Sequence, residues 1–145
     1  MDTTRAEINL QEFKKFKHAT IYWIQNHPEV AVIVANTSYI PIASFKGIFY
    51  SMEELVIEKK ISKLIFDKTQ LRVFHQPSME WYFVEWKEKM AALGLVNHVK
   101  ILPEDYNFCQ SVKIGRDLIN KNYPTARFHQ LSIQYAGTIE EAVRI

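Results

Sequence analysis

The chain is poor in cysteine, glycine and proline. It contains one cysteine, four glycines and five prolines among 145 residues. The single Cys109 excludes an intrachain disulfide and any Cys-x-x-Cys metal or redox site. Low glycine and proline contents argue against long disordered or low-complexity segments.

Long apolar runs are also missing. The first residues, MDTTRAEINLQEF, contain no apolar segment of the kind found in secretory signals. No run approaches the roughly 20 apolar residues of a membrane span. A lone thiol is typical of a reducing compartment. We therefore predict a cytoplasmic protein without membrane association.

The charge is close to balanced. The formal net charge is +2, and acidic residues separate the lysine clusters. Nucleic-acid binders usually carry a stronger positive charge on one face. We therefore predict no nucleic-acid partner.

The familiar catalytic and cofactor motifs are absent. The sequence has no P-loop, no GxGxxG and no GxSxG. None of the five histidines forms an HExxH motif or an i, i+4 pair on one helix. We predict no catalytic residues from motifs, no metal site and no cofactor.

The second half of the chain alternates short strand-like runs with longer helical ones. ISKLIFD, HVKILP and QLSIQYA are strand-like, and helical segments separate them. This alternation predicts an α/β fold with parallel strands joined by crossover helices. Upstream, ATIYWIQ and VAVIVAN flank the turn NHPE and predict an antiparallel hairpin.

The remaining segments complete one predicted domain over 9–145, after a flexible terminus at 1–8. Asn9 and Glu12 resemble a capping box, and the spacing of Leu10, Phe13 and Phe16 predicts a short helix. Pro41 suits the first turn of a longer helix, Asn107 is expected to cap a later helix, and Thr138 with Glu141 forms a capping box for a short final helix.

A helix predicted from Pro77 to Leu93 carries a broad apolar face. At 100° per residue, Trp81 points away from that face and lies among Glu85 and Glu88. Tryptophan is enriched at protein interfaces, so these three residues form a candidate partner or dimer surface. Alternatively, the hairpin or the N-terminal helix covers Trp81.

Polar residues follow the predicted strands at their carboxyl ends. Asp67, Thr69 and Asp105 would gather at one edge of a parallel sheet, where open α/β folds bind ligands. The acids there could perform acid–base chemistry, or they could simply satisfy turn amides. Cys109, near a helix start, is either reactive or a small buried residue.

Ser78 lies in the first turn of the Pro77 helix. A phosphate there would meet unpaired amides and the positive end of the helix dipole. The ordinary alternative is a serine that caps or begins the helix.

The order of these segments resembles the STAS-like superfamily, which includes bacterial anti-sigma-factor antagonists. The likeness spans roughly residues 21–145 and depends on the strings LIFD, LPED and TIEEAV. It implies a four- or five-stranded mixed sheet with helices mainly on one face. In the antagonists a kinase phosphorylates a serine after a strand-end aspartate, and Asp67 and Ser78 stand near those positions. Here the chain reads His75-Gln-Pro-Ser78-Met-Glu and lacks the acid, second serine and glycine of that motif.

Two functional hypotheses follow. The first is a non-enzymatic, cytoplasmic regulatory module of STAS-like type. It would bind a protein partner or a second copy of itself around Ser78 and Trp81. The alternative is a small-molecule binder or an unrecognised enzyme that uses the crevice near Asp67 at the strand ends.

Overall fold

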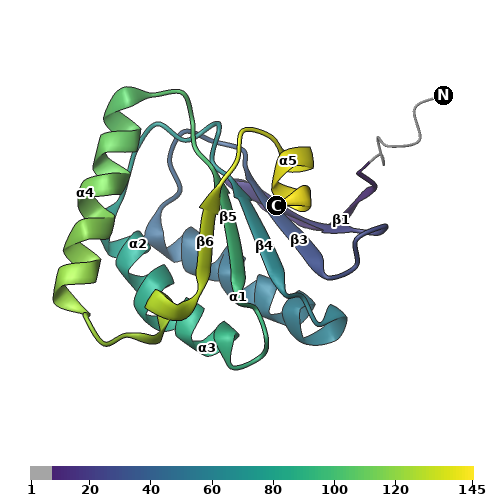
Figure 1. Cartoon of the computed structure of the whole chain (residues 1–145). Helices are drawn as coiled ribbons and strands as arrows, with labels where there is room; N and C mark the ends of the chain where they lie inside the picture. The colour runs from purple at the N-terminus through teal and green to yellow at the C-terminus, as the bar shows by residue number, and fades with distance from the viewer. Residues whose placement is uncertain (1–7) are drawn as a thin grey trace.

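The computed structural model of the chain describes residues 8–145 and builds them around one mixed β-sheet of six strands (Figure 1). The strands follow one another in the sheet in the same order as in the sequence. Their bounds are β1 Leu10–Lys15, β2 Ala19–Ile24, β3 Val30–Ala35, β4 Lys63–Asp67, β5 Asn97–Ile101 and β6 Ser132–Tyr135. The four or five strands implied by the resemblance are therefore too few.

The predicted antiparallel hairpin is confirmed as β2 and β3. From β3 to β6 each neighbouring pair of strands is parallel, as the alternation of strand and helix predicted. The buried strands β3 and β4 are rich in apolar residues, because helices cover both faces of this part of the sheet.

The extra strand is β1, where the sequence pattern predicted a helix. It pairs antiparallel with β2, and the register shifts between Glu12 and Lys14, so that Phe13 is the additional residue of a β-bulge. The bulge interrupts the two-residue alternation of a strand, so the spacing of Leu10 and Phe13 imitates a helix. The predicted flexible terminus lies outside the described residues, apart from Ile8, which packs on the smaller core.

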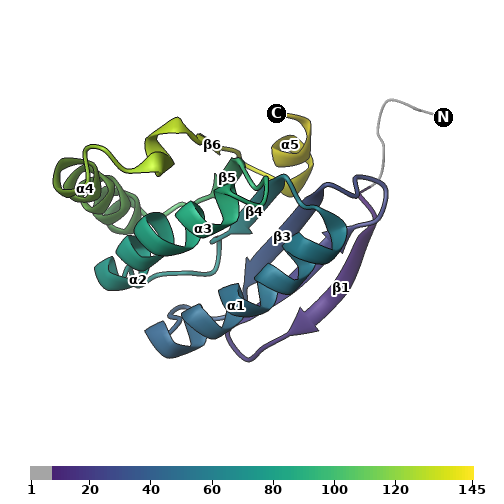
Figure 2. The same cartoon turned by 90° about the horizontal axis from the view of Figure 1, so that it is seen from below.

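The helices divide unequally between the faces of the sheet (Figure 2). Together with the sheet, α1 (Ile42–Lys59), α2 (Gln76–Trp81), α3 (Lys87–Ala91) and α4 (Tyr106–Asn122) enclose the larger core. On the opposite face, α5 (Ile139–Arg144) covers a smaller cluster. The start of α1 after Pro41 matches the prediction.

The helix predicted from Pro77 is continuous but irregular. A π-helical turn, Tyr82–Trp86, joins α2 to α3. Such a turn adds a residue to the helical repeat and shifts every following side chain around the axis. The shift helps to place Lys87 inside the protein, where it is fully buried.

Helix α4 lies on the β6 side of the molecule (Figures 1 and 2). Asp105 is its N-cap and accepts a hydrogen bond from the amide of Phe108 at 3.0 Å, whereas the sequence suggested Asn107 as the cap. Gly115 allows α4 to approach the chain before α2, since a Cβ there would lie 2.7 Å from the Phe74 ring. This close approach fixes the position of α4 beside the edge strand.

The short helix α5 has the predicted cap at Thr138, whose hydroxyl accepts from the amide of Glu141 at 3.1 Å. Its other end is held by the sheet. The Nζ of Lys63 in β4 donates to the carbonyl oxygens of Ala142, Val143 and Ile145. A cation is favourable there because the last carbonyls of a helix carry partial negative charge.

Candidate functional site

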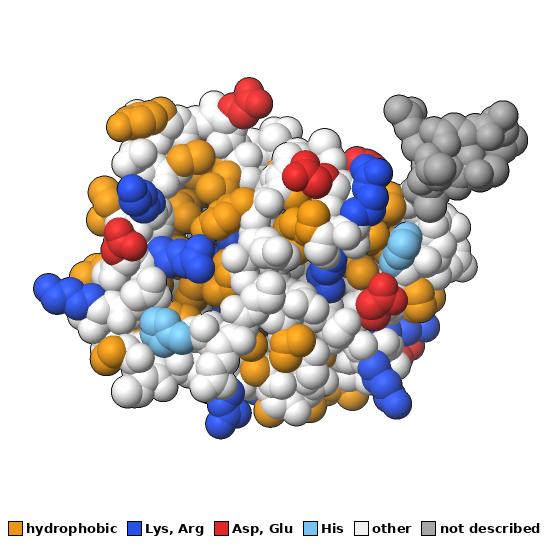
Figure 3. Space-filling model, in the orientation of Figure 1, with side chains coloured by type: hydrophobic (Ala, Val, Ile, Leu, Met, Phe, Trp, Pro, Cys, Tyr) orange, Lys and Arg blue, Asp and Glu red, His pale blue; other side chains and the backbone are white. Residues whose placement is uncertain are grey.

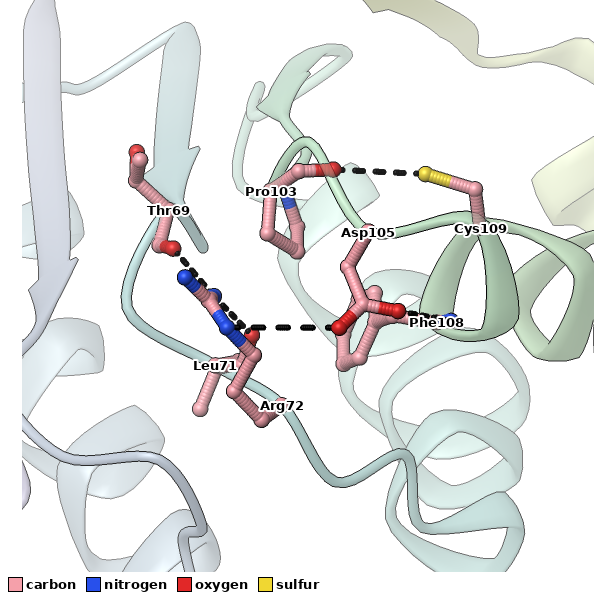
Figure 4. Close-up of polar contacts among 7 residues, drawn as sticks. All are labelled: Thr69, Leu71, Arg72, Pro103, Asp105, Phe108 and Cys109. Atoms are coloured by element: carbon pink, nitrogen blue, oxygen red, sulfur yellow. Dashed lines mark hydrogen bonds and ion pairs between the residues drawn. The ribbon is translucent and has the colours of Figure 1, made fainter.

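Thr69 and Asp105, two of the residues predicted at the carboxyl edge of the sheet, lie on either side of Arg72 there (Figure 4). Arg72 links them: its Nη1 donates to the carbonyl of Thr69 at 2.8 Å, and its Nε lies 3.9 Å from the carboxylate of Asp105. Asp67 accepts from the amide of Thr69 at 3.0 Å. The topology therefore assembles this edge as the sequence predicted.

These contacts correspond to the simpler of the two interpretations. Asp67 forms a turn with Thr69, and Asp105 caps α4. The Sγ of Cys109 donates to the carbonyl of Pro103 at 3.4 Å and is half-buried (Figure 4). The two carboxylates are engaged in local turn and cap contacts, so they do not form an acid–base pair.

Ser78 and Trp81 lie inside the protein, with 5% and 8% of their surfaces exposed. The Ser78 hydroxyl is 2.8 Å from Nδ1 of His75. The indole of Trp81 packs edge-on against Phe45 and Tyr50 of α1. The prediction that Trp81 points outward is wrong, because α1 covers the side of α2 that faces away from the apolar stripe.

The two glutamates predicted beside Trp81 do not form a surface with it. Glu85 is exposed. Glu88 accepts a hydrogen bond from the amide of Arg127 and lies 3.8 Å from its guanidinium. It thereby holds the 3₁₀ turn Arg127–Gln130, which precedes β6.

Two lysine side chains are buried side by side between α3 and β5. Lys87 is 0% exposed and Lys100 is 1% exposed. Both amino groups lie over the rings of Tyr82 and Phe83, with Nζ 3.6 Å (Lys87) and 4.5 Å (Lys100) from the centre of the Phe83 ring. Neither Nζ has a hydrogen-bond partner among residues 8–145. Buried charges are normally paired, so this pair lacks the usual structural explanation.

The surroundings of the pair make a charge there still less favourable. Burial lowers the pKa of Lys87 and of Lys100 well below the usual lysine value, and repulsion from Lys68 and Arg116 lowers both further. Burial also lowers the pKa of Lys68 to about 8. We call Lys68, Lys87, Lys100 and Arg116 the basic cluster.

A histidine and a tyrosine extend the buried polar region. The hydroxyl of Tyr82 lies 3.3 Å from Nδ1 of His98, and no described residue hydrogen-bonds to Nε2 of His98. Burial first, and then repulsion from Lys87 and Lys100, lowers the pKa of His98. Burial raises the pKa of Tyr82. Both side chains are therefore neutral at physiological pH.

An open cleft lies next to the basic cluster, between α4 and β6. It has a volume of about 480 Å³, and its lining residues are Leu102, Cys109, Val112, Lys113, Arg116, Asp117, Asn120 and Tyr135. Figure 3 shows the hollow, with hydrophobic side chains on its floor and Lys or Arg side chains at its rim. We call it the edge cleft.

Arg116 connects the edge cleft to the buried amines. Its Nη1 donates to the hydroxyl of Tyr135 at 2.8 Å, and Tyr135 is the strand partner of Lys100. A second hollow of about 150 Å³ also includes Arg116, and Phe83 forms part of its wall. The ring that carries both amino groups therefore borders the same open region.

The sequence reasoning missed the basic cluster, although a signal was present. In His98-Val99-Lys100-Ile101, two-residue alternation places His98 and Lys100 on one face and the apolar residues on the other. Strand β5 lies between two neighbours, so both of its faces are covered. A lysine at the centre of an interior strand is a candidate functional residue, because burying its charge is costly.

No family model matches the sequence, and neither the curated proteins nor the solved structures include one significantly similar to it. In the described part of the chain, no three or more His, Cys, Asp or Glu side chains form a group that could hold a metal ion. Among helices of the described residues, none combines the length and apolarity that crossing a bilayer requires.

Proposed function

We propose that the protein binds a small anionic molecule, carrying a carboxylate or phosphate group, in the edge cleft. The observation that carries this proposal is the pair of buried, unpartnered amines of Lys87 and Lys100 together with Arg116, which interacts electrostatically with both and lines that cleft. Strongly perturbed ionisable groups next to a concavity are typical of functional sites.

The electrostatics favour an anion over a neutral ligand. All the charged groups that perturb the pKa values of Lys87 and Lys100 are cations. A bound anion would turn this mutual repulsion into attraction and would favour the protonated amines. Arg116 supplies a planar guanidinium, which suits two-point contact with a carboxylate or phosphate.

The small-molecule hypothesis from the sequence is retained, but the proposed site lies between α4 and β6 instead of near Asp67. Consecutive strands β3 to β6 are joined by crossovers on the same face, so the sheet has no reversal of strand order there to open a crevice. The cleft forms instead where the sheet stops at β6 and α4 lies beside its edge.

A binding experiment with simple anions tests this function. We expect inorganic phosphate or lactate to raise the unfolding temperature in a saturable way, because a ligand that binds only the folded state stabilises it by about 2.7 kcal/mol at 100 times its Kd. Chloride at equal ionic strength serves as the reference for general salt effects.

Two matched variants locate the effect. Arg116→Gln should remove most of the anion-dependent stabilisation, whereas Lys17→Gln, which alters an exposed lysine just after β1 at the opposite edge of the sheet, should retain it. If no anion exceeds the chloride reference, or if both variants respond like the wild type, the edge cleft is not an anion site.

Membership of the STAS-like superfamily stays a prediction. It is supported by the hairpin that precedes the parallel strands and by the Pro-initiated helix that follows LIFD. Partner binding around Ser78 and Trp81 forms no part of the proposed function, because both side chains are buried.

A further inference from the structure

The two buried amines have neighbours that suit a nucleophile and its proton donor. Lys87 projects from α3 and Lys100 from β5, and both amino groups contact the Tyr82 and Phe83 rings. An amine attacks carbon only in its neutral form, and burial next to other cations is an established way to keep a lysine neutral. Ion pairing cannot account for this arrangement, because the amines have no partner in the part of the chain that the structure describes.

We propose that Lys100 forms an imine with a small oxo acid, meaning an aldehyde or ketone that also carries a carboxylate or phosphate. This inference deepens the proposed function and depends on it: the basic cluster holds the anionic group, and Lys100 reacts with the carbonyl group of the same molecule.

Lys100 is assigned as the nucleophile because its strand partner, Tyr135, lines the edge cleft, whereas Lys87 lies on α3. Burial and repulsion from neighbouring cations lower the pKa of both amines. In the proposed reaction Lys100 is therefore the free amine and Lys87 is the acid beside it.

The reaction balances with these two residues and the oxo acid alone. The lone pair of Lys100 attacks the carbonyl carbon, and the π electrons move to oxygen, which takes a proton from Lys87. Lys87 then removes a proton from the attacking nitrogen and returns it to the hydroxyl group. Water leaves, a protonated imine remains, and Lys87 is neutral, so the pair carries one positive charge before and after.

Access to Lys100 leads past the contact between Arg116 and Tyr135. Tyr135 lies beside Lys100 in the sheet, and its hydroxyl accepts a hydrogen bond from Arg116. Tyr135 is 44% exposed. An entering carboxylate competes with the tyrosine hydroxyl for the guanidinium. An anion that binds Arg116 would therefore break the contact between Arg116 and the strand partner of Lys100.

Reductive trapping with pyruvate tests the imine directly. The full-length protein is incubated with pyruvate and sodium cyanoborohydride at neutral pH, and the adduct is located by peptide mass mapping. We expect one adduct on Lys100, formed about tenfold or more faster than on exposed lysines, which stay protonated at this pH. Lactate, which has the carboxylate but no carbonyl, should compete and form no adduct.

Variants separate the roles of the two lysines. Lys100→Met should lose the adduct, and Lys87→Met should retain the site of reaction but slow the reaction about tenfold through loss of the proton donor. Lys17→Met, which alters an exposed lysine just after β1 at the opposite edge of the sheet, should react like the wild type. Unfolding curves establish that each variant is folded before its reaction is compared.

The outcomes distinguish this inference from the proposed function. If lactate stabilises the protein but pyruvate is trapped nowhere, or is trapped equally on exposed lysines, the anion site stands and the imine is wrong. If neither lactate nor phosphate stabilises the protein and no adduct forms on Lys100, both proposals are wrong.

Discussion

Two sets of buried lysines lie on opposite faces of the same sheet, and they differ in what surrounds the amino group. Lys63, under α5, donates to three carbonyl oxygens at the end of that helix. Lys87 and Lys100, under the opposite face, have two aromatic rings and no hydrogen-bond acceptor. Burial lowers the pKa of all three lysines.

This difference separates a structural lysine from lysines that the fold does not explain. Lys63 satisfies helix-end carbonyls that would otherwise lack partners, so its burial stabilises the position of α5. The ring contacts of Lys87 and Lys100 offset only part of the loss of hydration. Residues that lower stability and make no compensating contacts are commonly retained because activity needs them.

The largest expected effect in this comparison is from Lys63→Met. The substitution leaves the carbonyls of Ala142, Val143 and Ile145 without their donor, and we expect it to reduce the free energy of unfolding by about 3 kcal/mol. Urea denaturation measures the change, with Lys113→Met as the surface control. An unchanged midpoint would show that Lys63 does not hold α5.

On the opposite face of the sheet, replacing a buried lysine should raise the free energy of unfolding instead of lowering it. Lys87→Met and Lys100→Met each replace a buried amine with a flexible apolar side chain that packs well on aromatic rings, and should raise the free energy of unfolding by about 1–2 kcal/mol. The two gains should not add fully, since the side chains share contacts. Destabilisation by either substitution would place these lysines with Lys63 as structural residues.

The sequence predicted those parts of the fold that depend on local patterns. Alternation of strand and helix predicted the parallel strands, Pro41 marked the start of α1, and Thr138 with Glu141 marked that of α5. Strand β1 was missed because its β-bulge gives apolar residues a helical spacing, and because pairing with β2 depends on residues distant in sequence.

The candidate site was less predictable because it depends on packing between elements. The edge residues Asp67, Thr69 and Asp105 were placed correctly by topology, but their contacts are those of turns and caps. The sequence left open whether Trp81 is exposed at an interface or covered by the hairpin or the N-terminal helix, because helical periodicity does not reveal that α1 packs against it. Only the tertiary structure brings Lys87 of a helix and Lys100 of a strand to the same rings.

The smallest expected effect is the change in the free energy of unfolding with pH that comes from Lys68 of the basic cluster. Burial lowers its pKa to about 8 in the folded protein, from 10.5. Between these values the unfolded chain binds more protons than the folded one, so Lys68 alone should add about 1 kcal/mol to the rise in stability between about pH 8 and 9. Urea denaturation at several pH values measures this slope.

Lys68→Met should reduce the rise, while exposed Lys113→Met should leave it unchanged. Saturating phosphate should also flatten it, because a bound anion favours the protonated lysines and brings their folded-state pKa values closer to those of the unfolded chain. A slope that is insensitive to both Lys68→Met and phosphate would mean that these lysines do not share one electrostatic environment. In that case the lysines of the basic cluster could no longer be distinguished electrostatically from Lys63, which donates to carbonyl oxygens of the protein itself.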